Sequence, residues 1–147
     1  MAQLDDRELA AQLYNRCWEL LETPREQRDD VELLTTAFSS RYHWLIAGAA
    51  EQWIVSDWMV ARAAAAVGNG DLALLFAKRA HSAAQEGENP DWLVASTAEG
   101  VARAYATLGD VEEFNHWSAL AARLVDAIAD PEDQELIASQ LADIEAP

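Results

Sequence analysis

The fold is decided by a stretch that occurs twice in related form: WMVARAAAAVGNGDLALLFAKRAHSAAQE at residues 58–86 and TAEGVARAYATLGDVEEFNHWSALAARLV at residues 97–125. Superposing Gly70-Asp71-Leu72 on Gly109-Asp110-Val111 gives a period of 39 residues, from position 70 to position 109. A period in this range, with two helices in each unit, is typical of helical solenoids. Each hairpin of such an array has an apolar face that only a neighbouring hairpin can cover.

Composition agrees with one all-α domain. The chain has 147 residues, of which 51% are hydrophobic, and it contains only six glycines and four prolines. This length is enough for one compact core, and scarce glycine and proline favour helix. Apolar periodicity and the punctuating residues predict seven helices at about 6–22, 30–46, 50–67, 71–86, 90–108, 111–129 and 131–144.

Helix boundaries follow from capping chemistry. Asp5 and Glu8 have the spacing of a capping box, and Thr23-Pro24 ends the first helix because the residue before proline avoids the α region. Residues 25–30 are predicted to form a loop, and Asn89 is predicted to cap the helix that Pro90 begins. The second helix is predicted to bury an apolar stripe formed by Val31, Leu34, Phe38, Tyr42 and Leu45.

The second copy resembles a tetratricopeptide repeat (TPR). The small, aromatic, glycine, acidic and apolar positions of that motif are occupied by Ala102, Tyr105, Gly109, Asp110, Val111 and Ala121. The chain departs from the motif at Phe114, where alanine is usual, and at Pro131, which comes later than the closing proline. Ala66 replaces the aromatic residue in the first copy. The segment Arg41-Tyr42-His43-Trp44, followed by Gly48, Trp58 and Arg62, is also similar to uncharacterised bacterial TPR-like proteins.

This resemblance implies a short right-handed superhelix of three antiparallel helix pairs and a C-terminal capping helix. It also implies a groove, lined by the first helix of each pair, that binds an extended peptide or a partner helix. The groove positions map to Asp57, Val60, Ala64, Ser96, Glu99 and Arg103. The chain lacks the basic and amide residues with which chaperone-binding TPR domains clamp a terminal carboxylate.

The formal net charge of −16 disfavours nucleic acid and anionic membranes as partners, and favours basic or apolar proteins. No apolar run is long enough to span a bilayer, and the first six residues do not form a secretory signal. The single Cys17 lies on an apolar stripe and is interpreted as an inert buried thiol. We therefore expect a cytoplasmic protein.

No constellation for metal or nucleophilic catalysis is found in the sequence. Among the three histidines, only Glu113 and His116 have a Glu-x-x-His spacing, and a di-iron bundle needs a second such pair on another helix. Cys17 has no base near it in sequence, and the glycines at 68 and 70 lack the lysine of a phosphate loop. We therefore predict no metal, no cofactor and no enzymatic activity.

Two ionisable groupings remain as candidates. His43, Arg62 and Glu99 are predicted to meet at the edge of the groove, whereas Glu99 and Arg103 have the spacing of an intrahelical ion pair. Arg62 either pairs with a nearby carboxylate or anchors an anionic ligand.

Trp53 and Trp58 are the tryptophans most suited to reach a binding surface. The leading hypothesis is a non-catalytic protein–protein interaction module. The alternatives are a small-molecule sensor or enzyme that uses the His43/Arg62/Glu99 cluster, and a homodimer.

Overall fold

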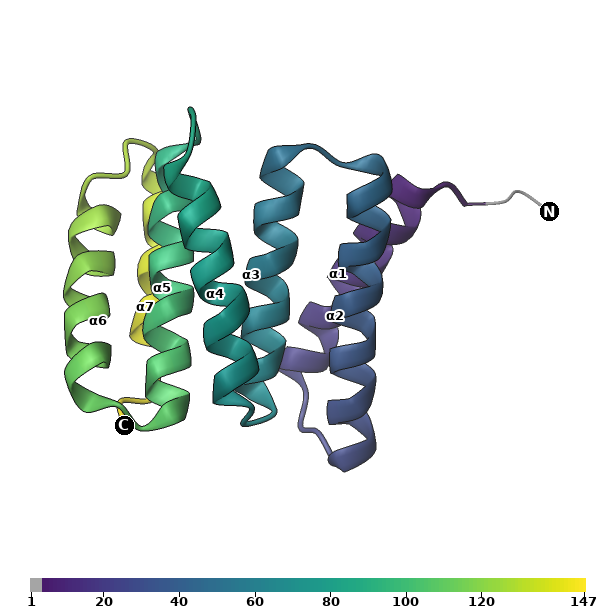
Figure 1. The fold of residues 1–147 in the computed structure, drawn as a ribbon, viewed down its shortest axis with the longest axis horizontal. Coiled ribbons are helices and arrows are strands. Elements are labelled where there is room, and N and C mark those ends of the chain that lie inside the picture. Colours follow the sequence, from purple (N-terminus) through teal and green to yellow (C-terminus); the bar gives the residue numbers. More distant parts are fainter. Residues whose placement is uncertain (1–3) are drawn as a thin grey trace.

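The computed structural model describes residues 4–147 and contains, within them, seven α-helices and no strand. The prediction of an all-α fold with seven helices is therefore confirmed. The helices are α1 (Asp6–Glu22), α2 (Gln27–Ala47), α3 (Ala50–Ala66), α4 (Gly70–Gln85), α5 (Asp91–Leu108), α6 (Val111–Asp126) and α7 (Pro131–Ala142) (Figure 1).

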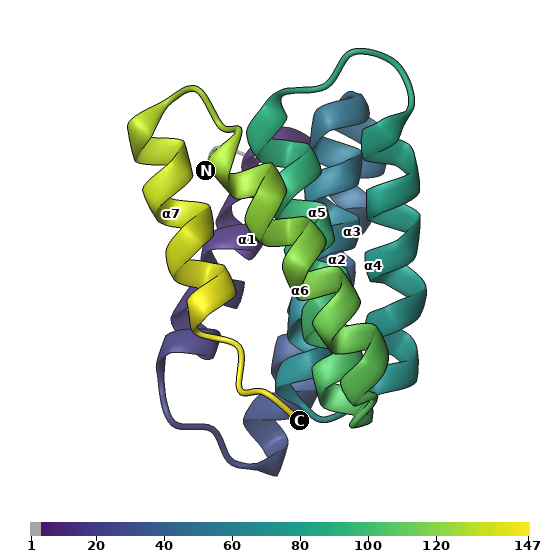
Figure 2. The ribbon, with the colours of Figure 1, turned by 90° about the vertical axis from the view of Figure 1, so that its left-hand side faces the viewer.

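Consecutive helices form three hairpins, α1/α2, α3/α4 and α5/α6, and α7 packs on α5 and α6. The helices α1, α3, α5 and α7, called here the inner row, contact one another in that order. The outer row consists of α2, α4 and α6, and within the described residues the backbones of these helices do not come close to one another. Helices α2 and α4 each pack on α3, one on either side of it. Figure 2 shows α1 and α7 on the same side of the molecule, away from α4.

The helix ends follow the predicted chemistry at some places and depart from it at others. The capping box of α1 is confirmed, because Asp5 Oδ1 accepts from Glu8 N at 2.8 Å and Glu8 Oε2 accepts from Asp5 N at 3.2 Å. The predicted loop at residues 25–30 is too long, because α2 already begins at Gln27, where Asp29 Oδ2 accepts from Glu26 N at 3.0 Å. An acidic first turn satisfies free amide groups and complements the helix dipole.

Asn89 does not cap α5 as predicted. Its side-chain amide instead donates to the carbonyl oxygens of Ala84 at 3.0 Å and Glu86 at 2.8 Å, so it satisfies the end of the preceding helix. The carbonyl groups in the last turn of a helix need donors as much as the first amides need acceptors. Pro90 lies immediately before α5 and not at its first position, and the fixed φ of proline is compatible with that place.

The structural repeat has a period of 41 residues, not the predicted 39. Helices α4 and α6 span 70–85 and 111–126, so both of their ends are 41 positions apart. Gly109, which ends α5 at φ 75°, corresponds to Gly68 at φ 82°, because both adopt the left-handed conformation. Gly70 is already the first residue of α4, where an added Cβ would lie 2.7 Å from Leu108 Cδ2. The pair Asn89-Pro90 and the pair Asp130-Pro131 follow the same 41-residue spacing.

The core lies between the two rows and is rich in alanine. Leu33, Met59 and Leu93 are fully buried in one cluster, and each contributes about 1.5–3 kcal/mol by leaving water. A second cluster joins α3, α4 and α5 mainly through small residues, including Ala61, Ala73 and Ala104. Small side chains let these three helices approach closely. As a result, α3 and α5 of the inner row are enclosed by neighbouring helices on most sides.

The predicted buried stripe of α2 is wrong for most of its members. Four of its five residues are exposed: Val31, Phe38, Tyr42 and Leu45. The face of α2 that packs inside carries Leu33, Thr36, Ala37 and Ser40. The small side chains of that face suffice because α1 and α3 come close to it, and Ser40 Oγ donates to the carbonyl of Ala10 at 2.8 Å.

His81 gives the fold a specific response to acid. It is buried on α4, its Nδ1 lies 3.0 Å from Thr97 Oγ1, and burial lowers its pKa. The unfolded chain therefore binds a proton at this imidazole more readily than the folded chain. We expect the free energy of unfolding contributed by this site to be intact above pH about 6.5 and to be lost as the pH falls through the folded-state pKa.

Urea unfolding of the wild type and of His81→Gln across this pH range checks the prediction. The glutamine amide does not titrate, so the variant should lose less stability than the wild type on acidification. Parallel pH profiles for the two proteins would contradict it.

Candidate functional site

A fully buried carboxylate lies between the helices of the inner row. Glu99 on α5 is 0% exposed, and its Oε1 accepts from Arg103 Nε at 3.0 Å and from Arg103 Nη2 at 2.8 Å. Its Oε2 accepts from Trp58 Nε1 on α3 at 3.2 Å. Arg62 Nη1, also on α3, lies 3.5 Å from Oε1. We call Arg62, Glu99 and Arg103 the arginine–glutamate cluster.

The 41-residue repeat explains how the chain assembles this cluster. Trp58, Glu99 and Gln140 occupy equivalent positions on α3, α5 and α7, as Arg62 and Arg103 do on α3 and α5. The equivalent Trp58 and Glu99 are in direct contact, and Arg103, one turn after Glu99, reaches the carbonyl of Gln140 with its Nη2 at 2.9 Å. Sequence reasoning missed Gln140, and the spacing of 41 residues was the signal that could have found it.

Arg62 is the least satisfied member of the cluster. Its guanidinium carbon lies 5.4 Å from the centre of the Trp18 ring, and its Nη2 lies 3.7 Å from Asp143 Oδ2. Its Nη1 is buried and has no hydrogen-bond partner among the described residues. Burial, and then the positive charge of Arg103, lower the pKa of Arg62, while Glu99 acts in the opposite direction.

His43 does not join this cluster. Its Nδ1 lies 2.7 Å from Asp6 Oδ1 at the start of α1, and its ring packs edge-on against Tyr42. Trp18, which lies under Arg62, is twelve positions along α1 from Asp6, and at 1.5 Å per residue this is roughly 18 Å. The predicted His43/Arg62/Glu99 constellation is therefore reduced to Arg62 and Glu99.

Asp57 and Trp53 lie on another side of α3. Asp57 Oδ1 accepts from Arg41 Nε at 2.6 Å, and its Oδ2 lies 3.5 Å from Arg79 Nε, so its partners come from α2 and α4. Trp53 Nε1 donates to the carbonyl of Trp44 at 2.9 Å, and its ring remains partly exposed. The predicted groove residues thus divide between an inner and an outer face, and several of them are buried: Asp57, Val60, Ala64, Ser96 and Glu99. Trp58 is also buried, so the prediction that it reaches a binding surface is wrong.

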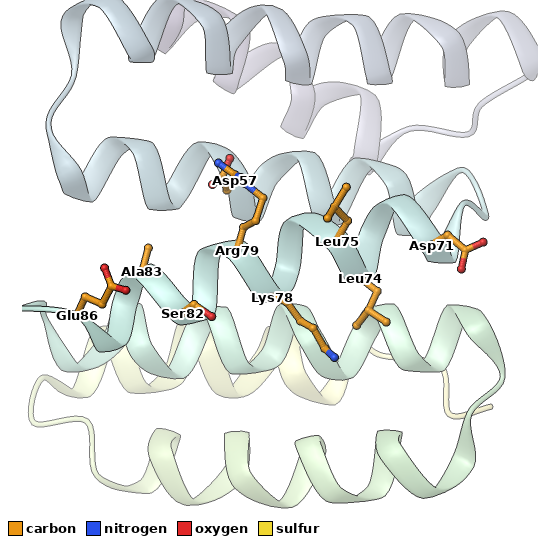
Figure 3. Close-up of a pocket in the computed structure, with 9 residues that line it drawn as sticks. All are labelled: Asp57, Asp71, Leu74, Leu75, Lys78, Arg79, Ser82, Ala83 and Glu86. Carbon is orange, nitrogen blue, oxygen red and sulfur yellow. Dashed lines mark ion pairs between the residues drawn. The ribbon is translucent and has the colours of Figure 1, made fainter.

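An outer groove opens between α2 and α4, over α3. Two adjoining hollows, with volumes of about 730 and 510 Å³, share Asp57, Arg79, Ala83 and Glu86. The first hollow runs along α4, where Asp57 and Arg79 point toward each other (Figure 3). Apolar side chains of the two hollows come from all three helices: Leu45, Trp53, Ile54, Leu74 and Leu75.

The described residues, 4–147, hold no group of three His, Cys, Asp or Glu side chains that could bind a metal ion. His116 is exposed and contacts the ring of Trp117. Cys17 is buried as predicted, and burial raises the pKa of its thiol to about 12. A thiol of this kind is a poor nucleophile at neutral pH.

Comparison of the chain with models of known families, with curated proteins and with solved structures gave no match. Across residues 4–147, no helix combines the length and the apolar character needed to cross a membrane.

The buried carboxylate is expected to be important for stability. Glu99→Ala leaves two guanidinium groups in the inner row without their main counter-charge. Removing one partner of a buried ion pair costs about 3–5 kcal/mol. Urea denaturation of the variant measures this loss.

Glu19→Ala is the matched control, because Glu19 pairs with Arg16 at 3.0 Å on the exposed surface of α1. An exposed pair of this kind contributes little to stability, because water and salt screen it. Equal losses in the two variants would show that the cluster does not stabilise the fold.

Proposed function

We propose that the protein is a non-catalytic protein–protein interaction module that binds an amphipathic helix in its outer groove. The observation that carries the proposal is the row of exposed apolar side chains on α2, which continues onto α3. Tyr42 is 61% exposed, Leu45 47% and Trp53 44%. Single exposed apolar residues are ordinary, but an aligned set beside a groove is typical of an interaction site.

The spacing of the row suits a helical partner. Phe38, Tyr42 and Leu45 recur at helical intervals, and Phe38 packs edge-on against Phe76 of α4 at 5.5 Å across the groove. The carboxylate of Asp57, on the floor between α2 and α4, is compensated by ion pairs with both Arg41 and Arg79. A groove with an apolar wall and no unpaired carboxylate on its floor is suited to receive the apolar stripe of another helix.

The charge of the rim indicates the chemistry of the partner. Asp71, Glu86 and Glu88 line the two hollows together with Lys78, and none of the three carboxylates forms an ion pair with another described residue. Together with the net charge of −16, these carboxylates favour a helix whose polar flanks carry lysine or arginine. The same net charge on a second copy disfavours a homodimer through this face.

The finer architecture belongs to the same proposal. We infer a TPR-like right-handed superhelix, supported by the contacts along the inner row and by the 41-residue repeat. In a TPR protein the ligand lies against the first helices of the pairs. Here those helices face the arginine–glutamate cluster, and Val60 and Ala64 are buried. This is why the proposal places the partner helix on the outer face.

Selection from a displayed library of amphipathic helical peptides tests the proposal. Selected peptides should carry an apolar stripe and basic flanks. Replacing Tyr42 and Leu45 together by alanine should weaken their binding by about tenfold or more, because a few large apolar anchors dominate such interfaces. Affinity measured by fluorescence anisotropy should also fall with added salt.

Leu136→Ala is the control, since Leu136 is an exposed leucine on α7, away from the outer groove. It should leave peptide binding unchanged. If no such peptides are selected, or if both variants bind equally well, the proposal fails. A concentration-dependent dimer that the double variant abolishes would assign the groove to a second copy instead.

A further inference from the structure

A second cavity, of about 460 Å³, lies beside the arginine–glutamate cluster on the inner face. Its walls include Arg25 from the α1–α2 loop, Arg62 from α3 and Arg103 from α5. The chain has ten lysines and arginines in all, so three of them meet at one cavity in a protein of net charge −16. The segment Asp143-Ile144-Glu145, directly after α7, forms the remaining polar edge.

The three guanidinium groups are not equally available. Arg25 is fully engaged, because it pairs with Asp30 at 2.9 Å and donates to the carbonyl of Leu20 at 3.0 Å. Arg103 donates to Glu99 and to the Gln140 carbonyl. Arg62 shares the Glu99 carboxylate with Arg103. Arg103 Nη2 lies 2.8 Å from Glu99 Oε1, whereas Arg62 Nη1 lies 3.5 Å from the same oxygen.

The cluster consequently carries one positive charge in excess. Two guanidinium groups share the single buried carboxylate of Glu99. The other carboxylates at the cavity are exposed: Asp143, which is 72% exposed and 3.7 Å from Arg62 Nη2, and Glu145. An exposed partner at that distance compensates a buried charge poorly.

We propose that this cavity binds a small organic acid, whose carboxylate takes the place of Asp143 at Arg62. A guanidinium edge matches the two oxygens of a carboxylate, and the site already holds one carboxylate through an arginine edge, because Arg103 Nε and Nη2 both donate to Glu99 Oε1. A volume of about 460 Å³ is in the range of small-molecule sites and exceeds what an inorganic anion fills. The inference is independent of the outer groove, which lies on the other side of α3.

Binding of acetate, succinate and benzoate, measured at constant ionic strength by thermal shift and by tryptophan fluorescence, tests the proposal. The fluorescence readout is informative because Trp18 lies under the Arg62 guanidinium. At least one carboxylate should bind saturably. Arg62→Gln should weaken that binding by about tenfold or more, because a charge-assisted pair is lost. Arg16→Gln, which removes a positive charge on the exposed part of α1, should leave it unchanged.

Asp143→Asn keeps the test decisive if Arg62→Gln is poorly folded, because Asp143 is exposed and its loss leaves the core intact. Removing this competing carboxylate should strengthen binding by about two- to fivefold. Inorganic phosphate serves as a further probe, and binding of phosphate alone would overturn the assignment to organic acids. Absence of saturable binding by all three carboxylates, or unchanged affinity in Asp143→Asn, would overturn the site itself.

Discussion

The carboxylate of Glu99 is the constraint on which the arrangement of the inner helices depends. A charge with no exposure to water is tolerated only when donors from its surroundings replace that water. Here the donors are Arg103 on the same helix and Trp58 on α3, and the Arg62 guanidinium adds a positive charge 3.5 Å from Oε1. Because Arg103 in turn reaches the carbonyl of Gln140, the same ionic contact also links α5 to α7. A shift of any of these helices along its axis by one turn would break at least one of these contacts.

Much of the fold could be predicted because the residues at the helix ends are recognisable in the sequence. Glycine, proline and acidic caps mark helix ends, and these signals act over a few residues. The repeat period was harder, because the Gly-Asp pairs at 70 and 109 are conspicuous but not equivalent. The left-handed backbone conformations of Gly68 and Gly109 identify the equivalent positions. A backbone conformation cannot be read from the residue type alone. An error of two residues matters, since it moves a helical side chain by about 200° around its axis.

The site was predictable where it depended on one helix and its nearest neighbour. Glu99 and Arg103 are four residues apart, so their pairing needs no tertiary information. Asp57 and Arg62 were assigned to one groove although five positions on a helix place them about 140° apart. Apolar periodicity likewise identified the amphipathic face of α2 around Tyr42, but it does not say whether the same chain covers that face. Trp18 became part of the site only through the packing of α1 on α3.

The two faces of α3 differ in their response to charge, and this difference follows from distance. The acidic rim of the outer groove acts on a partner through many exposed carboxylates, and salt screens such interactions over about 8–10 Å. The excess charge at Arg62 acts on an anion in direct contact, where mobile ions have little room to intervene. The net charge of −16 repels anions at long range, and salt weakens that repulsion first. Raising the ionic strength therefore opposes a basic helix at the outer groove far more than it opposes a small acid at the inner cavity.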